Sequence, residues 1–305
     1  MPGLTTKIVK ATAAPLAPEP DRLDVSVVIP AHNEEHGAGS TVERVRAVLS
    51  KLRVRFDVVV VDDGSSDGTK VAAERAGAQV IVSPVNRGYG SALKKGIAAT
   101  SSDYVVILDA DGTYPPEALP QLLELAKSVD MVVGDRSAAM FNVPFVRRPA
   151  KWLLSKLANF LARQNIPDLN SGMRVFKRES LERFIPLLPD GFSFTSTITL
   201  CMLSSNMDVT YIPIDYGKRV GHSKLRAVDF FNFVMLVLRI VMLFQPLRIF
   251  MPLGSVLFLL GVAKTIYDIT LWNLSESAVF CLLAALIIWS LGLIADMISR
   301  LHLRP

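Results

Sequence analysis

The chain has 305 residues, half of them hydrophobic, enough for one α/β domain followed by a segment too apolar for a water-soluble protein. Two cysteines far apart, Cys201 and Cys281, argue against a disulfide framework or a zinc site and fit a reducing compartment for the soluble part. The formal net charge is +5, but no basic module interleaved with aromatic residues is present, so nucleic acid is not an expected partner.

The first part of the chain predicts a tail and then an α/β domain. Residues 1–22 contain Pro and Ala without periodicity and no continuous apolar segment, so we expect a disordered tail rather than a secretion signal. Short runs rich in Val and Ile then predict buried strands at 25–30, 56–63, 79–84, 103–110 and 130–135. Stretches between them predict helices within 40–53, 66–77, 88–100 and 115–127. This alternation indicates an α/β domain over 23–225 with a mostly parallel sheet.

Polar or small residues follow each predicted strand. The carboxyl ends of parallel strands meet at one edge, where ligands bind in such sheets. Asp109 and Asp111, in the sequence DADG, follow the fourth strand, and two carboxylates so close can share a divalent cation that also holds a diphosphate. An isolated pair would more often cap the next helix. Here Asp62 and Asp63 end a second strand, so the edge collects more carboxylates than capping requires.

The C-terminal part of the chain predicts membrane attachment. Segment 226–247 has its polar residues on one helical face and Arg239 near its middle, which indicates an amphipathic juxtamembrane helix rather than a span. Residues 248–305 then contain two stretches long and apolar enough to cross a bilayer, at about 249–270 and 278–298.

The distribution of positive charge predicts the topology. The loop between the two predicted spans has no Lys or Arg, whereas Arg248 precedes the hairpin and Arg300 and Arg304 follow it. Positive residues mark the cytoplasmic side, so we expect a multi-pass protein of the cell membrane with its soluble domain and C-terminus in the cytoplasm. Residues 136–226 contain 14 Lys and Arg against 6 Asp and Glu, a balance that suits anions, including lipid phosphates.

Nine segments carry a resemblance to a known family. They are VSVVIPAHNEE, VVVVDDGSSDGT, NRGYGSALKKGI, DADGTYPPE, VVGDR, RRPAKWLLSKLANFLA, PDLNSGMRVFKR, FSFTSTITL and YGKRVGHSKL, and they cover residues 24–226. In order and spacing they resemble the family 2 glycosyltransferases with the GT-A fold, in particular the polyprenyl-phosphate mannose and glucose synthases. The resemblance implies inverting transfer of a hexose from GDP-mannose or UDP-glucose to a polyprenyl phosphate, with Mg²⁺ or Mn²⁺ as cofactor.

The resemblance also implies residue roles around the donor. The residues implied to bind the nucleotide sugar are Pro30, Ala31, Asn33, Glu34, Asp63, Asn86, Gly88, Asp109 and Ala110. Asp63 would accept a hydrogen bond from the base. Gly88 and Gly90 would let the following helix approach the nucleotide, although a purely structural turn needs the same glycines. Asp109 and Asp111 would bind the metal ion. Relatives often have DADLQ, and here Thr113 or a water molecule would replace the glutamine as a ligand.

The resemblance further implies which cations and acceptor groups act. Beside Asp111, the implied catalytic residues are Arg136, Arg219 and Lys224, the last two on a late segment that folds over the diphosphate. The acceptor phosphate is expected among Arg136, Arg147, Arg148, Lys151 and Ser155. On a helix the last three of these share a face. We interpret Asp168 and Ser171, in a predicted turn before a strand, as structural.

The type of acceptor also follows from chemistry. A sugar hydroxyl needs a general base, whereas a phosphate monoester is already an anion at neutral pH. The chain lacks the QxxRW segment of processive polysaccharide synthases, which also favours a lipid phosphate. Transfer to a lipid hydroxyl and a non-catalytic membrane-anchored subunit remain as alternatives, and homo-oligomerisation stays open. GYGSA is not a GxGxxG after the first strand, which argues against a dinucleotide-binding oxidoreductase.

Overall fold

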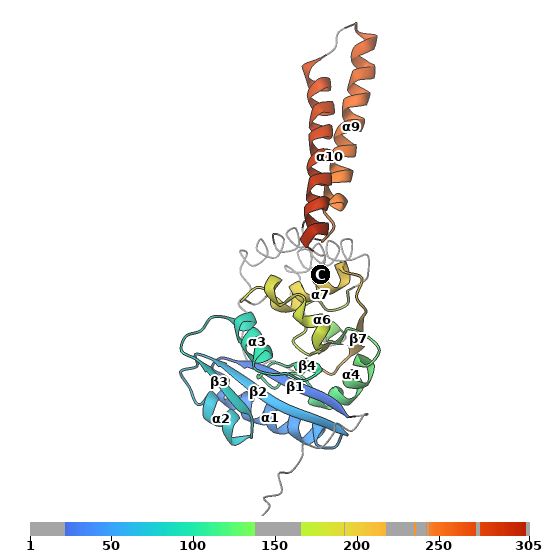
Figure 1. Cartoon of the computed structure of the whole chain (residues 1–305). Helices are drawn as coiled ribbons and strands as arrows, with labels where there is room; N and C mark the ends of the chain where they lie inside the picture. Colours follow the sequence, from blue (N-terminus) through green and yellow to red (C-terminus); the bar gives the residue numbers. More distant parts are fainter. Residues whose placement is uncertain are drawn as a thin grey trace, which may run out of the picture.

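The computed structural model describes residues 22–137, 166–191, 193–217, 235, 242, 244–272 and 275–302. These residues form an α/β domain and a hairpin of two long helices that extends away from it (Figure 1). The predicted tail and most of the predicted amphipathic helix at 226–247 lie outside the described residues, as does the segment 138–165.

A seven-stranded sheet forms the centre of the domain, in the order β3-β2-β1-β4-β6-β5-β7. The strands are β1 (Leu23–Ala31), β2 (Val54–Asp63), β3 (Gln79–Ser83), β4 (Tyr104–Ile107), β5 (Met131–Asp135), β6 (Arg174–Lys177) and β7 (Val209–Pro213). Strand β6 is antiparallel to both of its neighbours, and the other described pairs are parallel. The prediction of a mostly parallel sheet is therefore confirmed.

Helices cover both faces of the sheet, which explains the continuous apolar strand sequences. On β2, Val59 and Val61 belong to one buried core, and Val58 and Val60 belong to the other. Side chains of consecutive strand residues point to opposite faces, so both must be apolar when both faces are covered. Figure 1 shows α1 and α2 on one side of the sheet and α3, α6 and α7 on the other.

Each helix of the domain contributes to one of these two cores. The core below the sheet takes α1 (Glu35–Leu49), α2 (Thr69–Arg75) and α4 (Leu119–Ala126), which follows the short 3₁₀ helix η1 (Pro116–Ala118). The other core takes α3 (Tyr89–Ala98), α6 (Arg178–Glu182), the 3₁₀ helix η4 (Ile185–Leu187) and α7 (Phe194–Ser204). The polar residues of the predicted site follow the carboxyl ends of the parallel strands β1, β2 and β4.

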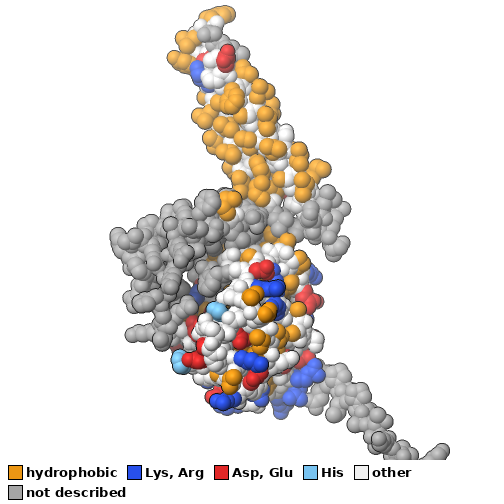
Figure 2. Space-filling model, turned by 90° about the vertical axis from the view of Figure 1, so that its left-hand side faces the viewer, with side chains coloured by type: hydrophobic (Ala, Val, Ile, Leu, Met, Phe, Trp, Pro, Cys, Tyr) orange, Lys and Arg blue, Asp and Glu red, His pale blue; other side chains and the backbone are white. Residues whose placement is uncertain are grey.

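The hairpin consists of α9 (Leu247–Thr270) and α10 (Glu276–His302). Both helices are long and apolar enough to cross a membrane, and each contains one of the predicted spans. Gly254 lies against the Trp289 ring and Gly261 against Leu282, so small residues of α9 admit large side chains of α10. Apart from charged side chains near the tip, the outward side chains are mostly apolar (Figure 2), as expected for a surface that faces lipid.

The base of the hairpin is joined to the α/β domain. Phe244 packs edge-on against Phe184, with ring centroids 6.2 Å apart, and is buried in the same core as α3 and α7. The side-chain amide of Gln245 donates to the carbonyl oxygen of Ser204 at 3.3 Å, at the end of α7. Ile249, in the first turn of α9, packs against this core as well. The hairpin is thus anchored on the side of the domain formed by α7 and η4.

Candidate functional site

A pocket opens where β1, β2 and β4 end. Its described lining residues are Pro30, Ala31, His32, Glu34, Asp63, Asn86, Tyr89, Ala92, Asp109, Ala110 and Asp111. This is the edge at which the sequence predicts a ligand. Strands β1 and β2 pair in parallel up to Ala31 and Asp62, so the residues that follow them emerge side by side. All the residues predicted to bind the nucleotide sugar contribute to the described lining except Asn33 and Gly88.

The DADG segment forms the turn after β4, and each aspartate has a hydroxyl donor. The Tyr89 hydroxyl donates to Asp109 Oδ1 at 2.8 Å. Thr113 donates to Asp111 Oδ1 from its backbone N at 3.1 Å and from its hydroxyl at 2.6 Å. Thr113 is buried and outside the described lining of the pocket. The structure therefore places Thr113 behind Asp111 as its donor, and its predicted role as a metal ligand finds no support in this geometry.

The two aspartates fit a divalent cation that is shared with an anionic ligand. Carboxylate oxygens are the ligands that Mg²⁺ and Mn²⁺ prefer, and both aspartates contribute to the pocket from a single turn. Among the described residues, no group of three or more His, Cys, Asp or Glu side chains could hold an ion by itself. Two carboxylates do not fill the coordination sphere of such an ion. Oxygen atoms of a ligand, such as those of a diphosphate, would supply the remaining positions.

Asp63 and the start of α3 form another wall. The Asp63 carboxylate accepts hydrogen bonds from the backbone N–H groups of Arg87 and Gly88, the latter at 2.7 Å. Asp63 still lines the pocket, and each carboxylate oxygen has more than one acceptor site. Its predicted hydrogen bond to the base stays a prediction that this geometry permits.

The glycines at the start of α3 serve a structural contact. Gly90 N donates to the carbonyl of Gly191 at 3.2 Å, and a Cβ at Gly90 would overlap the carbonyl oxygen of Pro189. Gly88 has φ +107°, and a Cβ there would lie 2.7 Å from the carbonyl oxygen of Asp190. These contacts give the glycines a structural role at the start of α3, and their role in letting this helix approach the nucleotide stays a prediction.

Asn33 connects two loops next to the pocket. It has φ 55°, in the left-handed region that Asn tolerates better than most residues. Its backbone N donates to the Ser65 hydroxyl and its side-chain oxygen accepts from Ser66 N, both at 2.9 Å. Asn33 thus ties the loop after β1 to the loop after β2, which fixes two walls of the pocket relative to each other.

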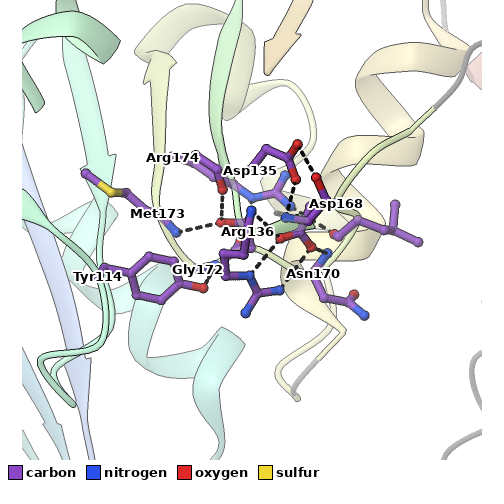
Figure 3. A network of polar contacts seen from close by, with 12 residues as sticks. Tyr114, Asp135, Arg136, Asp168, Asn170, Gly172, Met173 and Arg174 are labelled. Carbon is purple, nitrogen blue, oxygen red and sulfur yellow. Dashed lines mark hydrogen bonds and ion pairs between the residues drawn. The ribbon is translucent and has the colours of Figure 1, made fainter. Parts of the chain in front are cut away.

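Arg136 lies in a buried ion pair. Figure 3 shows its guanidinium against the Asp168 carboxylate, with Nε and Nη2 donating to the two carboxylate oxygens at 2.7 and 3.0 Å. The rings of Tyr216 and Tyr114 lie 5.2 and 5.8 Å from the guanidinium carbon. Arg136 is 8% exposed. The sequence predicts a phosphate-binding cation here. In the structure this guanidinium is buried and makes a bidentate ion pair with Asp168.

Charge compensation keeps this pair ionised. Burial alone would raise the pKa of Asp168, but hydrogen bonds from Arg136 and its positive charge outweigh that effect and hold this pKa below its ordinary value. Burial alone would lower the pKa of Arg136, and the hydrogen bond to Asp168 reverses the shift. The Ser171 hydroxyl donates to the carbonyl of Gly134. Both Asp168 and Ser171 therefore have the structural role expected from the sequence.

The segment after β7 begins beside the DADG turn. Gly217 N donates to the carbonyl oxygen of Thr113 at 2.8 Å. The ring of Tyr216 packs edge-on against Tyr114 with centroids 5.0 Å apart. This contact brings the start of the late basic segment to the turn that carries Asp111. The predicted cations that follow, Arg219 and Lys224, lie outside the described residues, as do Arg147, Arg148, Lys151 and Ser155.

Gly172 is a site residue that sequence reasoning missed. Its N–H donates to the Tyr114 hydroxyl at 2.6 Å, so the loop before β6 crosses directly behind the turn of Asp109. A Cβ at Gly172 would lie 2.6 Å from the carboxyl carbon of Asp109, closer than unbonded carbon atoms approach. The sequence NSG gives no signal for this contact. It arises because β6 inserts between β4 and β5.

Replacing Gly172 with Ala is expected to displace the Asp109 carboxylate. It should slow the sugar transfer that the family resemblance implies by about 10- to 100-fold, the usual cost of disturbing a support of a metal ligand. The measurement is the initial rate of nucleoside diphosphate release. Gly191→Ala is the matched control, because no atom of the described residues lies within 4 Å of a Cβ at that position. Equal rates for the two variants would contradict the role of Gly172.

Together, the mostly parallel sheet, the acidic turn after β4 and the pocket at the strand ends define a domain of the GT-A type. The chain belongs to glycosyl transferase family 2, whose model matches residues 26–185. A model of the GtrB C-terminal hairpin matches residues 245–301, which include α9 and most of α10. The chain is therefore a glycosyltransferase with a C-terminal hairpin of a known type, and the expected family and fold are confirmed.

Individual relatives agree with this assignment. An undecaprenyl-phosphate 4-deoxy-4-formamido-L-arabinose transferase of Sodalis glossinidius is 30% identical over 93% of this chain and 91% of its own. A dolichyl-phosphate hexose transferase of Haloferax volcanii is 34% identical over 66% of this chain and 86% of its own. The structure of glucosyl-3-phosphoglycerate synthase from Mycobacterium tuberculosis with Mn²⁺, UDP-glucose and phosphoglyceric acid superposes with a TM-score of 0.57, at 25% identity, over 72% of this chain and 79% of that one.

Proposed function

We propose that the chain transfers a hexose from a nucleotide sugar, GDP-mannose or UDP-glucose, to a polyprenyl phosphate at the cytoplasmic face of the membrane. The observation that carries the proposal is that the pocket and the apolar hairpin belong to one connected structure. The pocket with Asp109 and Asp111 lies in a domain whose core also buries Phe244 at the base of an apolar hairpin. A lipid acceptor and a water-soluble donor can meet at such a site.

In this proposal the pocket residues bind and orient the donor. Asp63 and Asn86 would hold the nucleotide, Asp63 by accepting a hydrogen bond from the base. Asp109 and Asp111 would hold a Mg²⁺ or Mn²⁺ ion together with the diphosphate. When bound, that ion supplies positive charge that stabilises the leaving diphosphate. The relatives whose names include undecaprenyl or dolichyl phosphate and the neighbour crystallised with Mn²⁺ and UDP-glucose support this assignment.

The acceptor brings its own nucleophile. A phosphate monoester is largely ionised at neutral pH, so no side chain has to remove a proton from it. Its oxygen would attack the anomeric carbon opposite the diphosphate, which inverts the configuration. Arg219, Lys224 and the group of Arg147, Arg148, Lys151 and Ser155 remain the proposed partners of the two phosphates. Arg136 would act indirectly, because its pair with Asp168 holds Tyr114 and Tyr216 beside the acidic turn.

A direct assay tests this proposal. The full chain, purified in detergent, is incubated with Mn²⁺, a panel of nucleotide sugars and either undecaprenyl phosphate or diacylglycerol. We expect release of GDP or UDP, with a sugar-labelled lipid product, only with the lipid phosphate. Transfer to diacylglycerol alone would instead establish a hydroxyl acceptor. Absence of transfer with every donor would favour the non-catalytic subunit and contradict the proposal.

A further inference from the structure

Tyr89 lines the pocket from a different element than the acidic turn. It is the first residue of α3, next to Asn86 and Ala92 on the nucleotide wall. Its ring packs against the core shared by α3 and α7, which fixes the position of its hydroxyl. From there the hydroxyl reaches Asp109 Oδ1 at 2.8 Å. One side chain therefore connects the proposed nucleotide wall with a proposed metal ligand.

Asp109 is confined by two contacts from separate parts of the chain. The Tyr89 hydroxyl holds one carboxylate oxygen, and the backbone of Gly172 lies so close that even a methyl group would not fit between them. A carboxylate held in this way has little freedom to rotate.

The hydrogen bonds of Thr113 to Asp111 differ in kind from the bond of Tyr89 to Asp109. Thr113 donates to Asp111 Oδ1 from only two residues away, and such a local hydrogen bond forms in many turns of this kind. The Tyr89 contact joins α3 to the turn after β4 across 20 residues, so local turn formation does not explain it. A tertiary contact that holds a ligand carboxylate is what outer-shell support of a metal site requires.

We propose that Tyr89 is a positioning residue of the metal site, whose hydroxyl orients the Asp109 carboxylate toward the ion. The inference deepens the proposed function and rests on it, since it requires that Asp109 and Asp111 bind a divalent cation. Because Tyr89 also forms part of the nucleotide wall, it links nucleotide binding to metal affinity.

The test is Tyr89→Phe, which keeps the ring and removes only the donor. Tyr211→Phe is the matched control, because the buried Tyr211 hydroxyl has no hydrogen-bond partner among the described residues. Mn²⁺ binding to the full chain is followed by the electron paramagnetic resonance of the free ion, with and without GDP or UDP. We expect Tyr89→Phe to raise the Mn²⁺ dissociation constant about 10-fold or more and Tyr211→Phe to leave it unchanged.

A second readout covers the case in which purified Tyr89→Phe is unstable. In membranes, Tyr89→Phe should need about 10-fold more Mn²⁺ for half-maximal transfer, and excess Mn²⁺ should restore most of the rate. Unchanged Mn²⁺ affinity, or a loss of rate that excess Mn²⁺ does not restore, would overturn the role of Tyr89. Absence of Mn²⁺ binding to the unmodified chain would instead remove the proposed metal site itself, so the two failures are distinguishable.

Discussion

Asp111→Asn is expected to slow sugar transfer about 100-fold or more while the fold stays intact. Asparagine keeps a side-chain oxygen that can accept the two hydrogen bonds from Thr113, so the turn is preserved. It loses the negative charge that would hold the ion on the diphosphate. Losing about 3 kcal/mol of charge stabilisation slows a reaction about 100-fold. The measurement is nucleoside diphosphate release at saturating Mn²⁺, together with the melting temperature.

The chain contains a matched control for this change. Asp67, in a second D-G-T sequence, accepts hydrogen bonds from the backbone N and hydroxyl of Thr69 as Asp111 does from Thr113, but Asp67 is outside the described lining of the pocket. Asp67→Asn should therefore transfer sugar at nearly the unmodified rate. Similar rates for Asp111→Asn and Asp67→Asn would mean that Asp111 only caps its turn, and the metal role would be lost.

The second large effect concerns stability. Asp168→Asn should destabilise the α/β domain by about 3 to 5 kcal/mol, because it leaves the buried Arg136 guanidinium without its counter-charge. For a domain of this size that corresponds to a melting temperature lower by about 6 to 20 °C, measured on the full chain in detergent. Glu117→Gln is the control, since its ion pair with Arg44 is exposed and exposed pairs contribute little.

The ion pair between Arg136 and Asp168 predicts that the stability of the domain depends on pH. The pKa of Asp168 is lower in the folded domain than its ordinary value, which is about 3.9. Its ionised form therefore stabilises the fold fully above that ordinary value, and this contribution is lost as the pH falls through the lowered pKa. The difference in melting temperature between the unmodified chain and Asp168→Asn should be constant near neutral pH and shrink below about pH 4. A constant difference down to lower pH would contradict the assignment.

Much of the fold could be predicted because both faces of the sheet are covered. Such strands read as continuous apolar runs, and all five predicted runs contain strands. The fourth ends earlier than predicted, at Ile107, where its pairing with β6 stops at Arg174. Strand β7 was not predicted, because it lies at the edge of the sheet and only Ile212 of its five residues is buried. Helix α7 is buried almost all round, so it lacks the apolar stripe that marks a helix.

The candidate site was only partly predictable. The residues after β1, β2 and β4 could be placed together because parallel strands end at one edge. The family resemblance of the GDR segment predicts a phosphate-binding role for Arg136, and only the structure shows that Asp168, distant in sequence, pairs with it. The contact of Gly172 with Asp109 and that of Tyr89 with the same carboxylate depend on how β6 and α3 pack. The spacing of residues along the sequence does not predict such tertiary contacts.

The attachment of Phe244 and Gln245 to the domain has a consequence for how the reactants meet. If the hairpin spans the bilayer as proposed, these contacts would hold the pocket close to the membrane surface. In the proposed reaction, the lipid then arrives by lateral diffusion in two dimensions, at the high effective concentration that confinement to one surface provides. Only the donor has to be captured from the bulk solution. Truncating the chain before Phe244 would remove this membrane attachment. It would also expose the apolar surface around Phe184 that Phe244 covers.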